Sequence, residues 1–160
     1  MLRKYLLGNC GLLLLPVFLW NILLYQHLPE AFQTRVWNNV PAYVSGVEFA
    51  GRVVLFTIPF FFLIGRTQKN HKRILYLFIA GLLLYFLSWL LLVLSPDTSW
   101  SNSILGQTAP AWSAGLWIIP LGFLFHAESP VRKFIQVLWF VSASIFLFFH
   151  TYHALLIFAK

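Results

Sequence analysis

The chain has few charged residues, few acids and one cysteine, and each shortage excludes a class of protein. Charged residues make up 9% of the 160 residues. Soluble domains carry about 25%, so this composition cannot build a water-facing surface. The single cysteine, Cys10, excludes an internal disulfide and any CxxC metal or redox motif. The sequence is therefore not that of a soluble globular domain.

Familiar catalytic motifs are also missing from the sequence. It contains no GxSxG, no Walker phosphate-binding loop, no glycine-rich dinucleotide turn and no cysteine nucleophile. Asp97 is the only aspartate, which excludes the aspartate pair that binds Mg²⁺ in lipid-phosphate transfer. We therefore expect a protein that is not a self-contained enzyme and that needs no cofactor.

Hydrophobic and aromatic residues are abundant. They account for 60% of the chain, with 17 Phe, 7 Trp and 6 Tyr, and the mean hydropathy is +0.80. The formal charge of +7 could suggest nucleic acid, but the Lys and Arg residues gather in short clusters between apolar runs, as membrane topology signals do. The sequence predicts an integral membrane protein whose partner is the lipid bilayer, with no nucleic acid.

Five segments are long and apolar enough to be membrane spans, which predicts an all-α bundle forming one domain over residues 1–160. The expected spans are residues 5–25, 44–65, 74–94, 106–125 and 134–158. In the fourth, the purely apolar part covers only residues 111–125, so Gln107 and Pro110 must supply the missing turn. No linker or internal repeat divides the chain.

The positive charges predict the orientation of these spans. Eight Lys and Arg residues lie on one side, and two lie on the other. The eight are Arg3, Lys4, Arg66, Lys69, Lys72, Arg73, Arg132 and Lys133; the two are Arg35 and Lys160. Because cytoplasmic loops carry the excess of Lys and Arg, we expect a cytoplasmic N-terminus and a C-terminus outside.

Glu48 and Arg52 lie one helical turn apart inside the second span. A charged side chain at bilayer depth costs about 2.5–3.5 kcal/mol, so such residues rarely persist without a partner or a function. The acid precedes the base at i, i+4, which suits an intrahelical ion pair. The pair is either a structural ion pair or part of the lining of a ligand-filled cavity.

Other polar residues are expected at a similar depth. At about 1.5 Å per residue, Glu48 lies roughly 10 Å and Arg52 roughly 4–5 Å on the outer side of the midplane. His150 and His153 come out roughly 7 Å and 12 Å to the same side. Asn21 lies in the outer third of the first span, and Asp97 follows the third. We therefore predict an outward-facing polar site formed by these six residues: Asn21, Glu48, Arg52, Asp97, His150 and His153.

His150 and His153 are spaced i, i+3 and so project from one face of the fifth span. Two such imidazoles can bind a metal, with Glu48 or Asp97 completing the ligand shell. The sequence contains no HExxH or ExxH motif and no second histidine pair. A hydrogen-bonded structural role and a role in proton handling or ligand contact therefore stay open beside metal binding.

Several short patterns resemble those of a group of small bacterial multi-span membrane proteins. The patterns are Trp20-Asn21, Leu28-Pro29, Glu48…Arg52, Ser99-Trp100-Ser101-Asn102-Ser103 and Ala109-Pro110-Ala111-Trp112. The resemblance implies a bacterial inner membrane location, and it implies no activity, cofactor or catalytic residue.

The expected function is non-enzymatic. The outward-facing pocket would bind a small polar solute, a proton or a lipid headgroup, or would help to move it across the membrane. The chain would act as a homo-oligomer or within a larger membrane complex, because five spans are few for a lone transporter. One alternative is a membrane-embedded enzyme that uses His150 or His153 as general base on a lipid or lipid-linked substrate at the outer leaflet. The other is an accessory subunit of a membrane complex.

Overall fold

The structure is a computed structural model that describes residues 8–28, 40–65 and 70–158. Within these residues the only extended pairing is two isolated β-bridges, and the ordered elements are helices, which confirms the all-α fold class. Four helical segments are long and apolar enough to cross a membrane. They are Cys10–His27, Ala42–Phe61, His71–Leu94 and Pro130–Phe158.

The first segment is built from η1 (Cys10–Leu14), α2 (Leu15–Leu24) and η2 (Tyr25–His27). The Asn9 side chain accepts a hydrogen bond from the Gly11 N–H at 2.7 Å and so caps η1. Pro16 lies in the first turn of α2, where its missing N–H leaves no helical bond broken. The start of the expected span, residues 5–7, lies outside the described residues.

The second segment consists of α4 (Ala42–Thr57) and η3 (Ile58–Phe61). The expectation that its helix continues to residue 65 is wrong. Pro59 lacks the N–H that would continue the helix, and residues 62–65 run in extended conformation instead. The Ile64 N–H donates to the Gly8 carbonyl and the Gly65 N–H to the Leu124 carbonyl, each at 2.8 Å. These bonds tie three parts of the chain together at one end of the bundle.

Two long helices complete the set, α5 (His71–Leu94) and α9 (Pro130–Phe158). Each begins a few residues earlier than expected. In α9 the early start has a local cause, because Pro130 is in the first turn and the Ser129 hydroxyl accepts the Arg132 N–H at 3.2 Å. At about 1.5 Å per residue, α9 is longer than the roughly 30 Å of a bilayer core.

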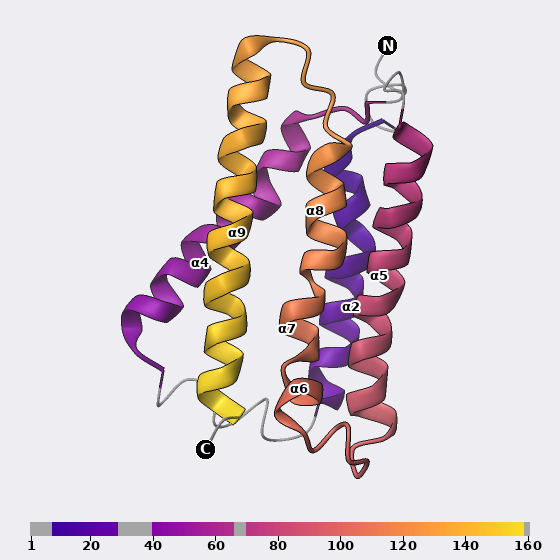
Figure 1. Cartoon of the computed structure of the whole chain (residues 1–160), viewed down its shortest axis with the longest axis vertical. Coiled ribbons are helices and arrows are strands. Elements are labelled where there is room, and N and C mark those ends of the chain that lie inside the picture. The colour runs from indigo at the N-terminus through magenta and orange to yellow at the C-terminus, as the bar shows by residue number, and fades with distance from the viewer. Residues whose placement is uncertain (1–7, 29–39, 66–69, 159–160) are drawn as a thin grey trace.

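Residues 104–123 form three short helices, α6 (Ile104–Gln107), α7 (Ala109–Ser113) and α8 (Gly115–Phe123). They follow one another in a column that runs antiparallel to α5 (Figure 1). A Cβ on Gly81 of α5 would collide with the Leu116 carbonyl, so glycine permits this close contact. Pro120 lies four residues after Leu116 and has no N–H, so the Leu116 carbonyl also lacks its usual hydrogen-bond donor within α8.

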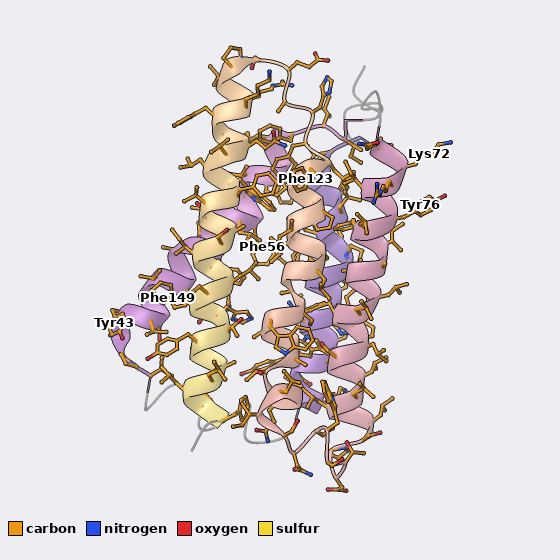
Figure 2. The ribbon with its side chains drawn as sticks, in the orientation of Figure 1. Tyr43, Phe56, Lys72, Tyr76, Phe123 and Phe149 are labelled. Atoms are coloured by element: carbon orange, nitrogen blue, oxygen red, sulfur yellow. The ribbon has the colours of Figure 1, made fainter. Side chains whose placement is uncertain are left out.

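The chain alternates in direction along the bundle. The starts of α5 and α9 lie at the same end as the last residues of α8 (Figure 1). The His126 N–H donates to the Leu63 carbonyl at 2.9 Å there. Lys72, in the first turn of α5, and Tyr43, in the first turn of α4, lie at opposite ends (Figure 2).

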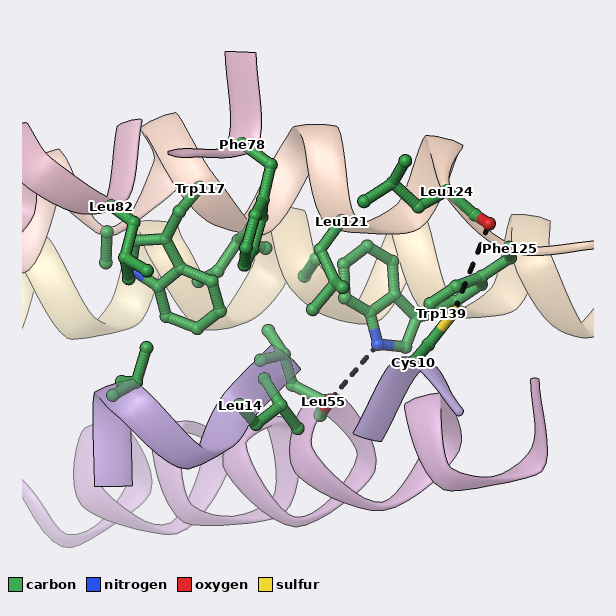
Figure 3. Close-up of a cluster of buried hydrophobic side chains, with 14 of the residues drawn as sticks. Cys10, Leu14, Leu55, Phe78, Leu82, Trp117, Leu121, Leu124, Phe125 and Trp139 are labelled. Atoms are coloured by element: carbon green, nitrogen blue, oxygen red, sulfur yellow. Dashed lines mark hydrogen bonds between the residues drawn. The ribbon is translucent and has the colours of Figure 1, made fainter. Parts of the chain in front are cut away.

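The core lies where α8, α5, α9, α4 and η1 meet, and it combines aromatic with aliphatic side chains (Figure 3). Trp117 and Trp139 are its largest fully buried side chains. The Trp139 indole N–H donates to the Leu55 carbonyl at 3.2 Å. That carbonyl is four residues before Pro59 and therefore has no helical donor at its usual position. The core thus supplies the hydrogen bond that the proline removes.

Candidate functional site

The candidate site lies between α4 and α9. The buried residues of α4 are Val44, Glu48, Gly51 and Leu55, which share one helical face. Those of α9 are Trp139, Ala143, Phe146 and His153, which also share one face. A Cβ placed on Gly51 would lie 3.0 Å from the Phe146 Cβ, so the missing side chain lets the two helices approach closely. Glu48 therefore stands within the packing face and not on the lipid-facing surface.

Glu48 accepts hydrogen bonds from three side chains. Its Oε1 accepts from Arg52 Nη2 within α4 and from His150 Nδ1 of α9 at 3.0 Å. Its Oε2 accepts from His153 Nδ1. The residue is 5% exposed, and a buried carboxylate is tolerated only when its oxygens are paired in this way. These four residues are called the Glu48 cluster below.

With Glu48 ionised, the contacts fix a proton of each histidine at Nδ1. An ionised carboxylate can only accept hydrogen bonds, so each imidazole must donate from Nδ1. In the neutral form of His150, this leaves the lone pair on Nε2. The side chain of His150 is 29% exposed, whereas that of His153 is 8% exposed. The cluster therefore has a closed side at His153 and an accessible side at His150 and Arg52.

Arg52 is the most accessible member of the Glu48 cluster, with 43% of its side chain exposed. Its guanidinium carbon lies 5.9 Å from the centre of the Phe146 ring, which gives a cation–π contact. The same ring stacks on His150, with ring centres 5.0 Å apart. Within the described part of the chain, the one hydrogen bond that Arg52 makes comes from Nη2. A guanidinium has five N–H donors, so Glu48 uses only a minority of them.

A shallow groove of about 460 Å³ begins at Arg52. It is lined by Arg52, Val53, Phe56, Thr57, Phe60 and Phe61. The groove follows α4 and η3 away from Ala42, so it opens along the side of the bundle. The prediction of a pocket at the outer end did not anticipate this lateral course.

In the described part of the chain, four of the six predicted site residues bond to one another, and the other two do not bond to them. Asn21 accepts a hydrogen bond from the Tyr85 hydroxyl at 2.7 Å, across the interface of α2 and α5. Asp97 is exposed in the turn after α5. The depth estimate places residues along the membrane normal but not around the bundle axis, which is why it grouped these two with the Glu48 cluster.

Phe146 contacts Arg52 and His150, and Tyr85 binds Asn21, but neither residue was predicted from the sequence. A signal for Phe146 was present, because residues 146, 150 and 153 follow the i, i+4, i+7 spacing of one helical face. Tyr85 lies within an apolar run and carries no such signal. In the described residues, no group of three or more His, Cys, Asp or Glu side chains is arranged to hold a metal.

Comparison of this chain with protein-family models, with curated proteins and with solved structures finds no match. The functional conclusion therefore depends on the Glu48 cluster and the groove beside it.

Proposed function

We propose that this chain is a non-enzymatic membrane protein whose Glu48 cluster binds an anionic group, carried by a small polar solute or by a lipid headgroup. The observation that supports this is the accessible guanidinium of Arg52. Arg52 gives Glu48 a single hydrogen bond through Nη2, and 43% of its side chain is exposed, so its other N–H donors can reach a further acceptor. A second anionic oxygen is the natural partner for the remaining N–H donors.

We further propose five spans, with the α6–α8 column as the fourth, a cytoplasmic N-terminus and an inner membrane location in bacteria. The antiparallel course of the column beside α5 supports this, together with the start of α9 near the start of α5. In a chain without its native cysteine, Ser99→Cys should react with an impermeant maleimide from outside. Glu128→Cys should react only after permeabilisation. Equal labelling of both from the same side would contradict the fifth span.

The binding proposal is tested on the guanidinium itself. Protein labelled with ¹⁵N at arginine is placed in nanodiscs, and the Arg52 side-chain signals are followed during titration with butyrate and with inorganic phosphate. We expect a saturable shift of these signals and not of those from Arg132, an arginine on the far side of the predicted membrane. An Arg52 signal that stays unchanged up to high concentrations of both anions contradicts the proposal.

A double variant separates this function from a purely structural ion pair. Glu48→Gln with Arg52→Met removes both charges and keeps side chains of similar length. If the pair is structural only, the variant unfolds at higher denaturant than the native protein and keeps its ligand binding. Our proposal predicts that anion binding is lost, whatever the change in stability.

One observation favours a second candidate, an enzyme acting on a lipid or lipid-linked substrate. The carboxylate of Glu48 orients His150 through Nδ1, and this arrangement prepares Nε2 to act as a general base. In that case His150→Gln would abolish turnover of a lipid extract while leaving the shift of the Arg52 signals intact. Lipid extracts that are unchanged after incubation with native protein would remove this candidate.

A further inference from the structure

The groove beside Arg52 indicates which class of anion the site takes. Arg52 stands at the border between two faces of α4, the face that packs on α9 and the face that lines the groove. Its guanidinium can therefore belong to the Glu48 cluster and still meet a molecule in the groove. A ligand seated there would have its polar end at Arg52.

Apart from Thr57, the residues that line the rest of the groove are apolar, and two of them contact other parts of the bundle. Phe56 contacts Phe18 of α2, with ring centres 4.9 Å apart. The ring of Phe60 lies against Gly11 of η1, in the space that a Cβ at this glycine would occupy. Val53, Phe60 and Phe61 are exposed. The two phenyl rings that contact α2 and η1 thus form one wall of the groove, with apolar side chains along its open side.

The length and volume of the groove suit one extended chain. From Arg52 to Phe61 the backbone rises about 14 Å, at about 1.5 Å per residue. The volume of about 460 Å³ is at the lower end of the roughly 300–1,000 Å³ typical of small-molecule sites. Arg52 lies roughly 4–5 Å on the outer side of the predicted midplane, which is about 10 Å below the outer edge of a hydrocarbon core of about 30 Å. A bulky phospholipid headgroup does not fit at this depth, whereas a small head on a single chain does.

We propose, as an extension of the proposed function, that the ligand is a single-chain amphiphile with a carboxylate head. Its carboxylate pairs with the guanidinium of Arg52, and its hydrocarbon chain lies along the groove against Phe56 and Phe60. The planar fork of arginine matches the geometry of a carboxylate. The charge of Arg52 therefore selects the head, and the apolar groove takes the part of the chain next to it.

The test uses palmitate labelled with ¹³C at the carboxyl carbon and full-length protein in phosphatidylcholine nanodiscs. We expect a saturable, protein-dependent carboxyl signal, and at least about tenfold weaker competition by hexadecanol, which has the same chain and no charge. Arg52→Gln should weaken palmitate binding by about tenfold or more, because it removes a charge-assisted hydrogen bond.

Two further variants test the groove without changing any residue of the Glu48 cluster. Thr57→Trp fills the groove and should weaken palmitate binding by about tenfold, while the shift of the Arg52 signals with butyrate persists. Phe49→Trp adds an indole at an exposed position of α4 outside the groove and should leave palmitate binding unchanged. Both variants should keep the unfolding midpoint of the native protein.

Four outcomes would overturn this inference. Equal binding of palmitate and hexadecanol means that the groove accepts any acyl chain, including those of bilayer phospholipids. A change of oligomeric state in Thr57→Trp, with palmitate binding intact, means that a second copy of the chain occupies the groove. If butyrate shifts the Arg52 signals and palmitate binds no more tightly, the amphiphile is refuted and the proposed function stands. If neither ligand affects Arg52, both proposals fail.

Discussion

The hydrogen bond between Trp139 and the Leu55 carbonyl gives a quantitative test of how the bundle is held together. Pro59 cannot donate to this carbonyl, and the indole N–H does so at 3.2 Å. Trp139→Phe removes the donor and keeps an aromatic ring in the fully buried position. The carbonyl is then left without a partner in an apolar environment.

The magnitude follows from the cost of an unpaired carbonyl. A buried polar group that loses its partner costs about 1–3 kcal/mol, and hydrogen bonds between membrane helices average about 0.6 kcal/mol with a maximum near 1.7. We expect Trp139→Phe to lower the free energy of unfolding by about 1–2 kcal/mol, including some lost packing. In a Pro59→Ala background the restored N–H can serve the carbonyl, so the same change should cost about 1 kcal/mol less.

The assay is reversible unfolding of the four proteins of this cycle by sodium dodecyl sulfate in mixed micelles, followed by far-ultraviolet circular dichroism. The coupling energy is the difference between the costs of Trp139→Phe in the two backgrounds. A coupling energy indistinguishable from zero would show that the indole does not replace the donor missing at Pro59. The inference that the Trp139 indole replaces the missing helical hydrogen bond of the Leu55 carbonyl would then be wrong.

Three further predictions concern the helix interfaces. Glu48→Gln should lower the free energy of unfolding by about 3 kcal/mol in the same assay, since it leaves a guanidinium at bilayer depth without its carboxylate; an unchanged midpoint would argue against the cluster. Gly51→Cys combined with Phe146→Cys should form a disulfide under mild oxidation, because the Cβ positions, 3.0 Å apart, need to separate by only about 0.5–1 Å to reach disulfide geometry; a pair that stays reduced would contradict the register of α4 and α9. Gly81→Ala should destabilise the fold by about 1–3 kcal/mol because α5 and α8 must separate, whereas Gly46→Ala, with open space around it, should be neutral or slightly stabilising; equal effects would refute the close contact.

Hydropathy predicts the long helices because lipid imposes a nearly continuous apolar sequence on each of them. α5 and α9 are apolar over most of their length, and both were expected within a few residues of their observed bounds. The end of α4 was not, because hydropathy does not register that Pro59 breaks the helix while the sequence stays apolar. The breaks on either side of α7 were not predicted for a related reason, because the hydropathy averaged over a window does not respond to Pro110.

The Glu48 cluster could be predicted in part from depth and helical spacing. Glu48, His150 and His153 lie at similar depth on faces that meet, and the structure joins them. The close contact between α4 and α9 depends on Gly51. The sequence does not show which helix this glycine faces, and this becomes clear only when the two helices are packed. The hydrogen bond between Tyr85 and Asn21 could not be predicted for the same reason. It depends on how α5 is rotated about its axis, which determines whether the Tyr85 hydroxyl faces α2.

The most direct test of the central claim measures the Glu48 cluster in a bilayer. Protein labelled with ¹³C at the glutamate carboxyl and ¹⁵N at histidine is reconstituted in lipid for solid-state NMR. We predict dipolar dephasing between the Glu48 carboxyl carbon and both His150 Nδ1 and His153 Nδ1, with protonated Nδ1 atoms, as the 3.0 Å contact at His150 requires. Absence of dephasing at both histidines, with the proton on Nε2, would contradict the account.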